Sequence, residues 1–161
     1  MTVAPPHLTR FVATVGYEMS YILCATRGGQ GSRALRQAAI ALARETGKSL
    51  LFLYVADLSA YDTGEKSLKE ALLSESRWLG RALLAIARRQ GLAAGVEVES
   101  MVRDGDIQEQ IQAVVEEKDV SVIMLGAPRG TTTNIFGDDA IEQLALELEE
   151  RTSVPVEIVR P

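Results

Sequence analysis

The stretch VSVIMLGAPRGTTTNIFGDD, residues 120–139, decides the expected fold of this chain. It begins with a run, Val120 to Leu125, that is apolar apart from Ser121 and rich in β-branched residues, which predicts a strand buried on both faces. Gly126 ends this run, and a loop of proline, glycine and threonine follows. Gly137-Asp138-Asp139 then opens a segment whose apolar residues recur at helical spacing. In an open parallel sheet, a junction of strand, loop and helix lies at the carboxyl ends of the strands, where ligands bind.

Outside this stretch, the chain alternates between strand-like and helix-like segments. Apolar runs predict two more buried strands, and an alternating pattern from Val96 to Met101 predicts a strand at the sheet edge. Pro155 restricts the last strand to an edge as well. In chain order, the predicted strands occupy residues 21–25, 50–55, 96–101, 120–125 and 154–159. Their alternation with helices predicts the α/β class: a doubly wound, Rossmann-like parallel sheet of five strands with helices on both faces.

The helices between these strands have recognisable ends. The first follows Gly31 and ends at Gly47, and the longest, residues 66–90, is expected to stop at Gly91. The apolar residues along one side of this long helix are Leu68, Leu72, Leu79, Leu83 and Ile86. Asp106 is expected to cap the next helix. The apolar face of that helix is formed by Ile107, Ile111, Val114 and Val115.

The length of 161 residues predicts one domain with its own core. We expect an N-terminal extension over residues 1–19, with a short extended piece at 11–15, and a single α/β domain over residues 20–161. The one cysteine, Cys24, lies in an apolar run and is interpreted as an inert core thiol. No apolar run approaches the roughly 18 residues of a membrane span, and the first residues lack a signal-peptide pattern. The sequence therefore predicts a cytoplasmic protein.

The bulk charge argues against polyanionic partners. The formal net charge is −5 at pH 7, the isoelectric point is about 5.0, and no basic stripe is evident along the sequence. We therefore predict neither nucleic acid nor an anionic membrane as a partner.

Few side chains suit catalysis or metal binding. The only histidine, His7, lies in the expected extension, so a Ser-His-Asp or Cys-His arrangement has no base and a zinc site lacks its ligands. The carboxylate pairs Asp104/Asp106 and Asp138/Asp139 are placed where helices are expected to start, and are interpreted as caps rather than Mg²⁺ ligands. We predict no catalytic residue, no metal site and no enzymatic activity.

A dinucleotide site is an alternative interpretation of the first junction between strand and helix. The stretch from Gly29 to Ala34, GQGSRA, satisfies G-x-G-x-x-G/A, and Asp57 ends the next strand, where such a site keeps its ribose-binding acid. However, the turn is longer than this fingerprint requires, and the chain offers five strands rather than six. A plain glycine-rich turn before a helix is therefore favoured.

Taken together, these segments resemble the universal stress protein family from about Tyr21 to Val159. The resemblance rests on the order and spacing of several pieces rather than on any one of them. These pieces are Ile22 to Ala25 followed by Ser32 to Ala38, Leu50 to Val55, Val102 to Ile107 with Ile111, Val122 to Gly126, and Val154 to Val159.

The resemblance implies a sheet of strand order 3-2-1-4-5 and, in many members, a homodimer. Some members bind ATP or AMP, and others bind no nucleotide. Binding members carry a loop of the form G-x2-G-x9-G-[ST] and an aspartate just after the first strand. Carried over to this chain, the nucleotide-binding positions are Ala25, Thr26, Arg27, Gly28, Val55, Val102, Gly126, Arg129, Gly130, Gly137 and Asp138.

This chain departs from the binding motif. Its loop reads Gly126-x3-Gly130-x6-Gly137, which moves the middle glycine and shortens the span, and an aspartate follows where serine or threonine is implied. Thr26 and Arg27 stand where the first-strand aspartate is implied. The departures predict weakened nucleotide binding without changing the expected fold.

The charges near the loop also oppose phosphate. A helix N-terminus attracts phosphate through its unpaired amides and positive dipole end, but Asp138 and Asp139 already supply anions there. Asp139 and Glu142 have the spacing of a capping box, which would use the same amides. Arg27 and Arg129 are expected to offset part of the repulsion.

The sequence therefore predicts a cytoplasmic binding or regulatory module with a weakened cleft for AMP or ATP, and a homodimer formed through the C-terminal strand. Two alternatives stay open: a dimeric interaction protein that binds no nucleotide, and a small enzyme that uses a nucleotide or dinucleotide.

Overall fold

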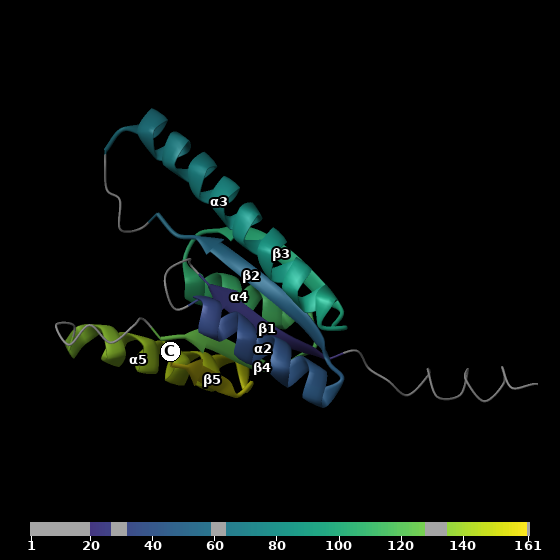
Figure 1. Cartoon of the computed structure of the whole chain (residues 1–161). Helices are drawn as coiled ribbons and strands as arrows, with labels where there is room; N and C mark the ends of the chain where they lie inside the picture. The colour runs from purple at the N-terminus through teal and green to yellow at the C-terminus, as the bar shows by residue number, and fades with distance from the viewer. Residues whose placement is uncertain (1–19, 27–31, 59–63, 128–134, 161) are drawn as a thin grey trace, which may run out of the picture.

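The computed structural model of the protein describes residues 20–26, 32–58, 64–127 and 135–160. Strands and helices alternate along the chain, as Figure 1 shows. The elements are β1 (Tyr21–Thr26), α2 (Ser32–Thr46), β2 (Ser49–Ala56), α3 (Lys66–Ala93), β3 (Val98–Asp104), α4 (Ile107–Glu117), β4 (Val120–Gly126), α5 (Ile135–Thr152) and β5 (Val156–Val159). The predicted extension, including His7, lies outside the described residues.

The sheet confirms the predicted topology. Its strand order is β3-β2-β1-β4-β5, and each neighbouring pair is parallel. The third and last strands lie at the edges, as the alternating pattern and Pro155 predicted. The third strand starts and ends later than expected, at Val98 and Asp104 rather than within residues 96–101.

Two apolar layers enclose the sheet, one on each face. Because successive strand residues point to opposite faces, Leu23 and Leu51 pack against α4 and α5, whereas Ile22 and Phe52 pack against α2 and α3. The second layer contains the cysteine, Cys24, which is buried as predicted. Helices thus cover both faces, which confirms the doubly wound architecture.

The long helix α3 differs from the sequence prediction in its end and in its buried side. The helix continues through Gly91 to Ala93. Gly91 does not end the helix but packs tightly on the edge strand, where a Cβ at this position would lie 2.5 Å from Cγ2 of Val98. The turn after the helix instead uses Gly95, whose φ is 80°. The side of α3 that meets the sheet consists of Gly80, Leu84, Ala87 and Gly91.

The apolar row predicted along α3 lies mainly on its exposed part. Leu68, Leu79 and Ile86 are each about half exposed. Small residues on the opposite side let the helix backbone approach the sheet, so the contact is made by glycine and alanine together with Leu84, and not by Leu68, Leu79 and Ile86.

The predicted helix starts are right at one place and wrong at two. Asp106 caps α4, and its carboxylate accepts a hydrogen bond from the backbone N–H of Glu109 at 3.0 Å. Asp104 instead ends β3 and pairs with Arg77 of α3. Helix α5 begins at Ile135, so Asp138 and Asp139 lie inside its first turns and cannot be its cap.

Candidate functional site

The ends of β1 and β4 meet at the point where the strand order reverses. Ala25 pairs with Leu125, which brings Thr26 and Gly126, the last residues of the two strands, beside each other. The chain leaves β1 toward α2 on one face and leaves β4 toward α5 on the other face. Ligands of doubly wound sheets bind in the crevice at such a switch point.

The predicted nucleotide-binding residues are only partly gathered here. Ala25, Thr26 and Gly126 lie together at the strand ends. Arg27, Gly28, Arg129 and Gly130 lie outside the described residues. Gly137 and Asp138 belong to the first turns of α5, the helix that follows β4.

Val55 and Val102 do not line one surface. Val55 is buried in the layer under α4 and α5, whereas Val102 packs against the layer under α2 and α3. Val102 is also separated from β1 by the whole of β2, since both it and Thr26 pair with Tyr54. Because of this strand register, Val55 lies next to the switch point and Val102 lies away from it.

Thr26 occupies the position where the family resemblance implies an aspartate. It borders a small apolar hollow of about 20 Å³ together with Cys24, Leu35 and Arg36. Burial raises the pKa of the Cys24 thiol to about 12, so this sulfur stays protonated and unreactive at neutral pH. The charged group at this position is thus an arginine from α2 instead of a carboxylate from β1.

Sequence reasoning missed a hollow between the end of β2 and the overhanging part of α3. It measures about 690 Å³ and is lined by Tyr54, Val55, Asp57, Leu58, Leu72, Glu75, Ser76, Trp78 and Leu79. The hydroxyls of Tyr54 and Ser76 lie 3.3 Å apart and share a hydrogen bond. Asp57, the predicted ribose ligand of the dinucleotide alternative, borders this hollow. The sequence signal for this hollow was Gly80, a glycine within a helical pattern. The missing side chain lets α3 pack directly on the Tyr54 ring.

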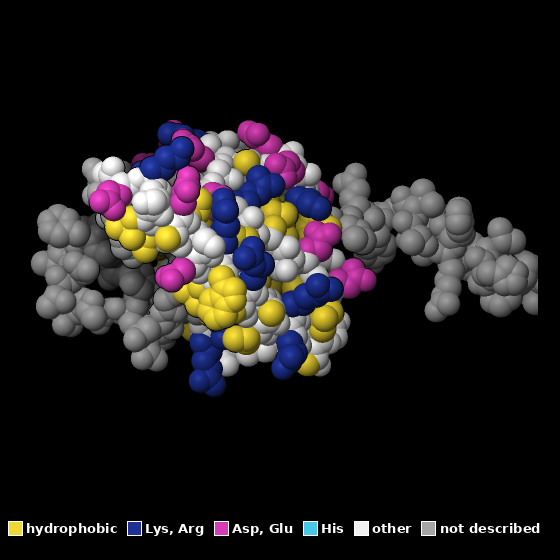
Figure 2. Space-filling view, turned by 90° about the horizontal axis from the view of Figure 1, so that it is seen from above, with side chains coloured by type: hydrophobic (Ala, Val, Ile, Leu, Met, Phe, Trp, Pro, Cys, Tyr) yellow, Lys and Arg dark blue, Asp and Glu magenta, His cyan; other side chains and the backbone are white. Residues whose placement is uncertain are grey.

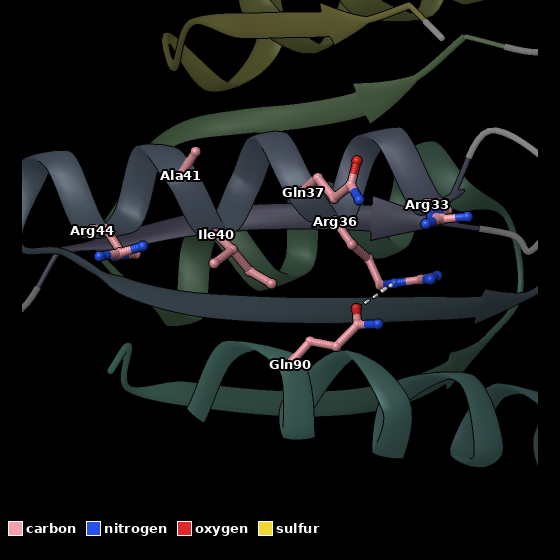
Figure 3. A pocket seen from close by; sticks show the side chains of 7 residues that line it. All are labelled: Arg33, Arg36, Gln37, Ile40, Ala41, Arg44 and Gln90. Carbon is pink, nitrogen blue, oxygen red and sulfur yellow. Dashed lines mark hydrogen bonds between the residues drawn. The ribbon is translucent and has the colours of Figure 1, made fainter. Parts of the chain in front are cut away.

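A second hollow follows the outer side of α2. About 560 Å³ in volume, it is lined by Arg33, Arg36, Gln37, Ile40, Ala41, Arg44 and Gln90 (Figure 3). All of these except Gln90 come from α2, and Nε of Arg36 donates a 3.2 Å hydrogen bond to Oε1 of Gln90 on α3. Arginines therefore border a short apolar floor between the two helices.

Within the described ranges, the structure contains neither a metal-binding cluster nor a membrane-spanning helix. No group of three or more histidine, cysteine, aspartate or glutamate side chains there could hold a metal ion. In the same ranges, every helix is too short or too polar to cross a membrane.

Comparisons with known proteins agree with this architecture. The model of the universal stress protein family matches residues 19–160. The universal stress protein UspA from Lactobacillus plantarum is similar in structure, with a TM-score of 0.66 and 20% identity over 90% of this chain and 100% of its own. A family member from Burkholderia pseudomallei reaches a TM-score of 0.66 and 25% identity over 89% and 98% of the two chains.

A structure with a bound nucleotide is also similar. The universal stress protein from Archaeoglobus fulgidus in complex with dAMP has a TM-score of 0.56 and 14% identity, covering 88% of this chain and 97% of its own. Among proteins with curated descriptions, none matches significantly.

Proposed function

The chain belongs to the universal stress protein family, and we propose that it is a binding or regulatory module with a weakened cleft for an adenine nucleotide, AMP or ATP, at the ends of β1 and β4. The observation that carries this proposal is the pairing of Ala25 with Leu125, which sets Thr26 beside Gly126 at the switch point. The dAMP complex of the Archaeoglobus fulgidus protein supports the choice of ligand class.

Two residues at this cleft weaken its binding of nucleotide phosphates. Thr26 cannot replace the charge of the implied aspartate, and Asp138 lies in the first turns of α5, where a phosphate would be attracted. A unit charge about 4 Å from a phosphate costs about 1 kcal/mol in water and about 4 kcal/mol at an effective dielectric constant near 20. Each additional phosphate should meet this repulsion, so AMP should compete well with ATP.

We further propose a cytoplasmic homodimer formed through β5. This edge strand comprises Val156 to Val159, and its outer backbone groups need a partner that the other strands of the sheet do not supply. Light scattering at micromolar concentration should show a dimer, and a species of only 17.4 kDa would contradict this part of the proposal.

Two measurements test the nucleotide proposal. Mass spectrometry of gently purified protein should detect retained adenine nucleotide. Calorimetry should then show that Asp138→Ser raises ATP affinity by about tenfold or more, since about 1.4 kcal/mol corresponds to a factor of ten. Glu150→Gln removes the same charge near the other end of α5 and should leave affinity unchanged.

The outcomes separate the alternatives. If Asp138→Ser binds ATP no more tightly at low salt, the shortened loop, and not charge, weakens the cleft. If neither variant nor parent binds any adenine nucleotide, the dimeric interaction protein is the better description. Turnover of a bound nucleotide would favour the enzyme alternative.

A further inference from the structure

The fold divides the charge of the chain between the two faces of the sheet. Helices α2 and α3 together carry nine lysines and arginines and three glutamates, a net charge of +6. Helices α4 and α5 carry nine aspartates and glutamates and one arginine, a net charge of −8. The net charge of −5 therefore hides a strongly basic face, although no basic stripe is evident along the sequence.

The same basic face carries most of the exposed large apolar side chains. Of the six that the described residues contain, five belong to α3 and one to α5. Those on α3 are Leu68, Trp78, Leu79, Ile86 and Leu92, and the Trp78 side chain is the most exposed, at 67%. Single exposed apolar residues are ordinary, but five on one helix form a surface that calls for a partner.

These side chains lie on the solvent side of α3 in an ordered arrangement. Leu68, Leu79 and Ile86 are separated by about three and about two helical turns, so they share one side of the helix. Gln90, which contacts Arg36 of α2, lies on the flank that faces the arginine-lined hollow. The other flank carries Arg81 and Arg88, which are two turns apart and exposed.

Apolar and basic side chains are thus interleaved over one broad face. Figure 2 shows lysine and arginine side chains standing between hydrophobic ones over α3. The arginines of the α2 hollow extend the basic surface beyond α3. Among the described residues, Arg81, Arg88 and Arg89 form no ion pair that would neutralise this surface.

We propose that this α2–α3 face docks on the surface of a bilayer rich in anionic lipid. The outer side of α3 would lie along the boundary between headgroups and acyl chains, where Trp78 and the exposed leucines and isoleucine bury their apolar surface. Arginines on both flanks would reach the lipid phosphates, as long cationic side chains do at membrane interfaces. The acidic α4–α5 face is repelled by the same surface and turns away, which selects one orientation.

Other partners would match only part of this face. Nucleic acid would pair with the arginines but would leave Leu79 and Ile86 in water. A second copy would bring two faces of net charge +6 together, which is unfavourable. A bilayer accommodates the convex outside of a helix roughly 40 Å long without a preformed groove and satisfies both kinds of side chain.

The experiment uses the full chain, whose only tryptophan is Trp78. Vesicles of equal parts phosphatidylglycerol and phosphatidylcholine should sediment with the protein at low salt and shift the tryptophan emission to the blue. Vesicles of phosphatidylcholine alone should do neither. Because surface electrostatics are screened over about 10 Å at 0.1 M salt, binding should weaken as salt is added.

Matched variants test each contribution. Arg81→Glu changes the surface by two charge units and should weaken partitioning roughly thirtyfold, taking about 1 kcal/mol per charge and 1.4 kcal/mol per factor of ten. Arg151→Glu, on the acidic α5, should change it little. Ile86→Ser should weaken binding and reduce the emission shift, whereas Leu146→Ser, at a residue that is even more exposed to solvent but lies on α5, should do neither.

Three outcomes would overturn the proposal. One is no binding to anionic vesicles at low salt. Another is vesicle binding that produces no emission shift and that double-stranded DNA or polyglutamate displaces. Such binding would point to a polyanionic partner or to simple charge pairing. The third is equal loss of binding in the α3 and α5 variants. None of these outcomes depends on the nucleotide cleft, so the two proposals fail independently.

Discussion

The two faces of the sheet bury equal numbers of core residues but build their contacts in opposite ways. Among the described residues, the buried cluster on each face has thirteen members, so the faces differ in whether the sheet or the helices supply the large side chains. On the α4–α5 face, the helices contribute large side chains such as Ile111 and Leu148. On the α2–α3 face, the sheet contributes Phe52 and Tyr54, and the helices contribute mainly alanine and glycine.

This difference shows how two helix layers with the same backbone geometry respond differently to mutation. A layer packed by large helical side chains loses stability when they are truncated, because a cavity remains. A layer packed by glycine and alanine loses stability when they are enlarged, because no space is left. The surfaces differ as well: the close-packed face is basic and the other is acidic.

The largest expected effect tests the α4–α5 layer. Ile111 is fully buried, so Ile111→Ala should lower the free energy of unfolding by about 2–5 kcal/mol. The same substitution at Ile86, which is half exposed on the opposite face, should change it by less than about 1 kcal/mol. Urea denaturation of both variants measures this difference, and equal losses would show that the described burial of α4 is wrong.

The next effect tests the close contact on the α2–α3 face. A Cβ at position 80 would lie 2.4 Å from Cδ1 of the Tyr54 ring, so Gly80→Ala must displace α3 or the ring. Overpacking costs about 1–3 kcal/mol, and the better helix propensity of alanine returns up to about 1 kcal/mol.

A double-mutant cycle provides the control for this contact. Replacing the ring by Tyr54→Leu should make Gly80→Ala markedly less costly, because the clashing atoms are removed. If Gly80→Ala destabilises the protein equally in both backgrounds, the ring contact is not the cause.

A smaller effect concerns the start of α4. Asp106→Ala removes the acceptor for the N–H of Glu109 and should cost about 1 kcal/mol. Asp106→Asn keeps an acceptor and should retain most of the stability. Thermal unfolding distinguishes the two, and an asparagine variant as unstable as the alanine variant would contradict the capping role.

The smallest effect concerns the ion pair that ties α3 to β3. Nε of Arg77 donates hydrogen bonds of 2.9 and 3.1 Å to the carboxylate of Asp104, and these bonds hold the pKa of Asp104 below its usual range. The pair therefore stabilises the fold above the unfolded pKa of about 3.9, and this contribution is lost as pH falls through the lower folded pKa.

Removing the Arg77–Asp104 ion pair should cause a small, pH-dependent change in the free energy of unfolding. Asp104→Asn should cost at most about 1 kcal/mol at neutral pH, because both side chains are more than a third exposed. The difference from the parent protein should shrink as pH falls below the unfolded pKa of about 3.9 and vanish once pH lies below the lower folded pKa. Glu116→Gln, on the exposed side of α4, is the control; a difference for Asp104→Asn that is independent of pH would contradict the ion-pair explanation.

The sequence predicted the strands well because their signal is local. Continuous apolar residues such as those from Leu50 to Val55 identify a strand buried on both faces, and the resemblance supplied the strand order, which the structure confirms. The buried side of α3 was not predictable in this way, because Gly80 and Gly91 carry no hydrophobic signal although they make the closest contacts.

The candidate site was predicted less completely for two physical reasons. Part of its motif lies outside the described residues, and α5 begins two residues before the expected helix start, so Asp138 lies in its first turns. Val102 was carried over from the resemblance, but strand register places it on the other face from Val55. The net charge of the whole chain did not reveal the separation of charge, although the basic helices α2 and α3 follow one another along the chain, as do the acidic helices α4 and α5.

The division of charge also has a consequence for handling the protein. Two layers of helices, each about 10 Å across, and the sheet between them separate the two charged faces by more than the screening length of about 10 Å at 0.1 M salt. Each face therefore interacts with a charged matrix nearly independently. A protein of net charge −5 is ordinarily retained by an anion exchanger alone at neutral pH. This protein should be retained by a cation exchanger as well, and its elution order on the two resins would report which face each variant has altered.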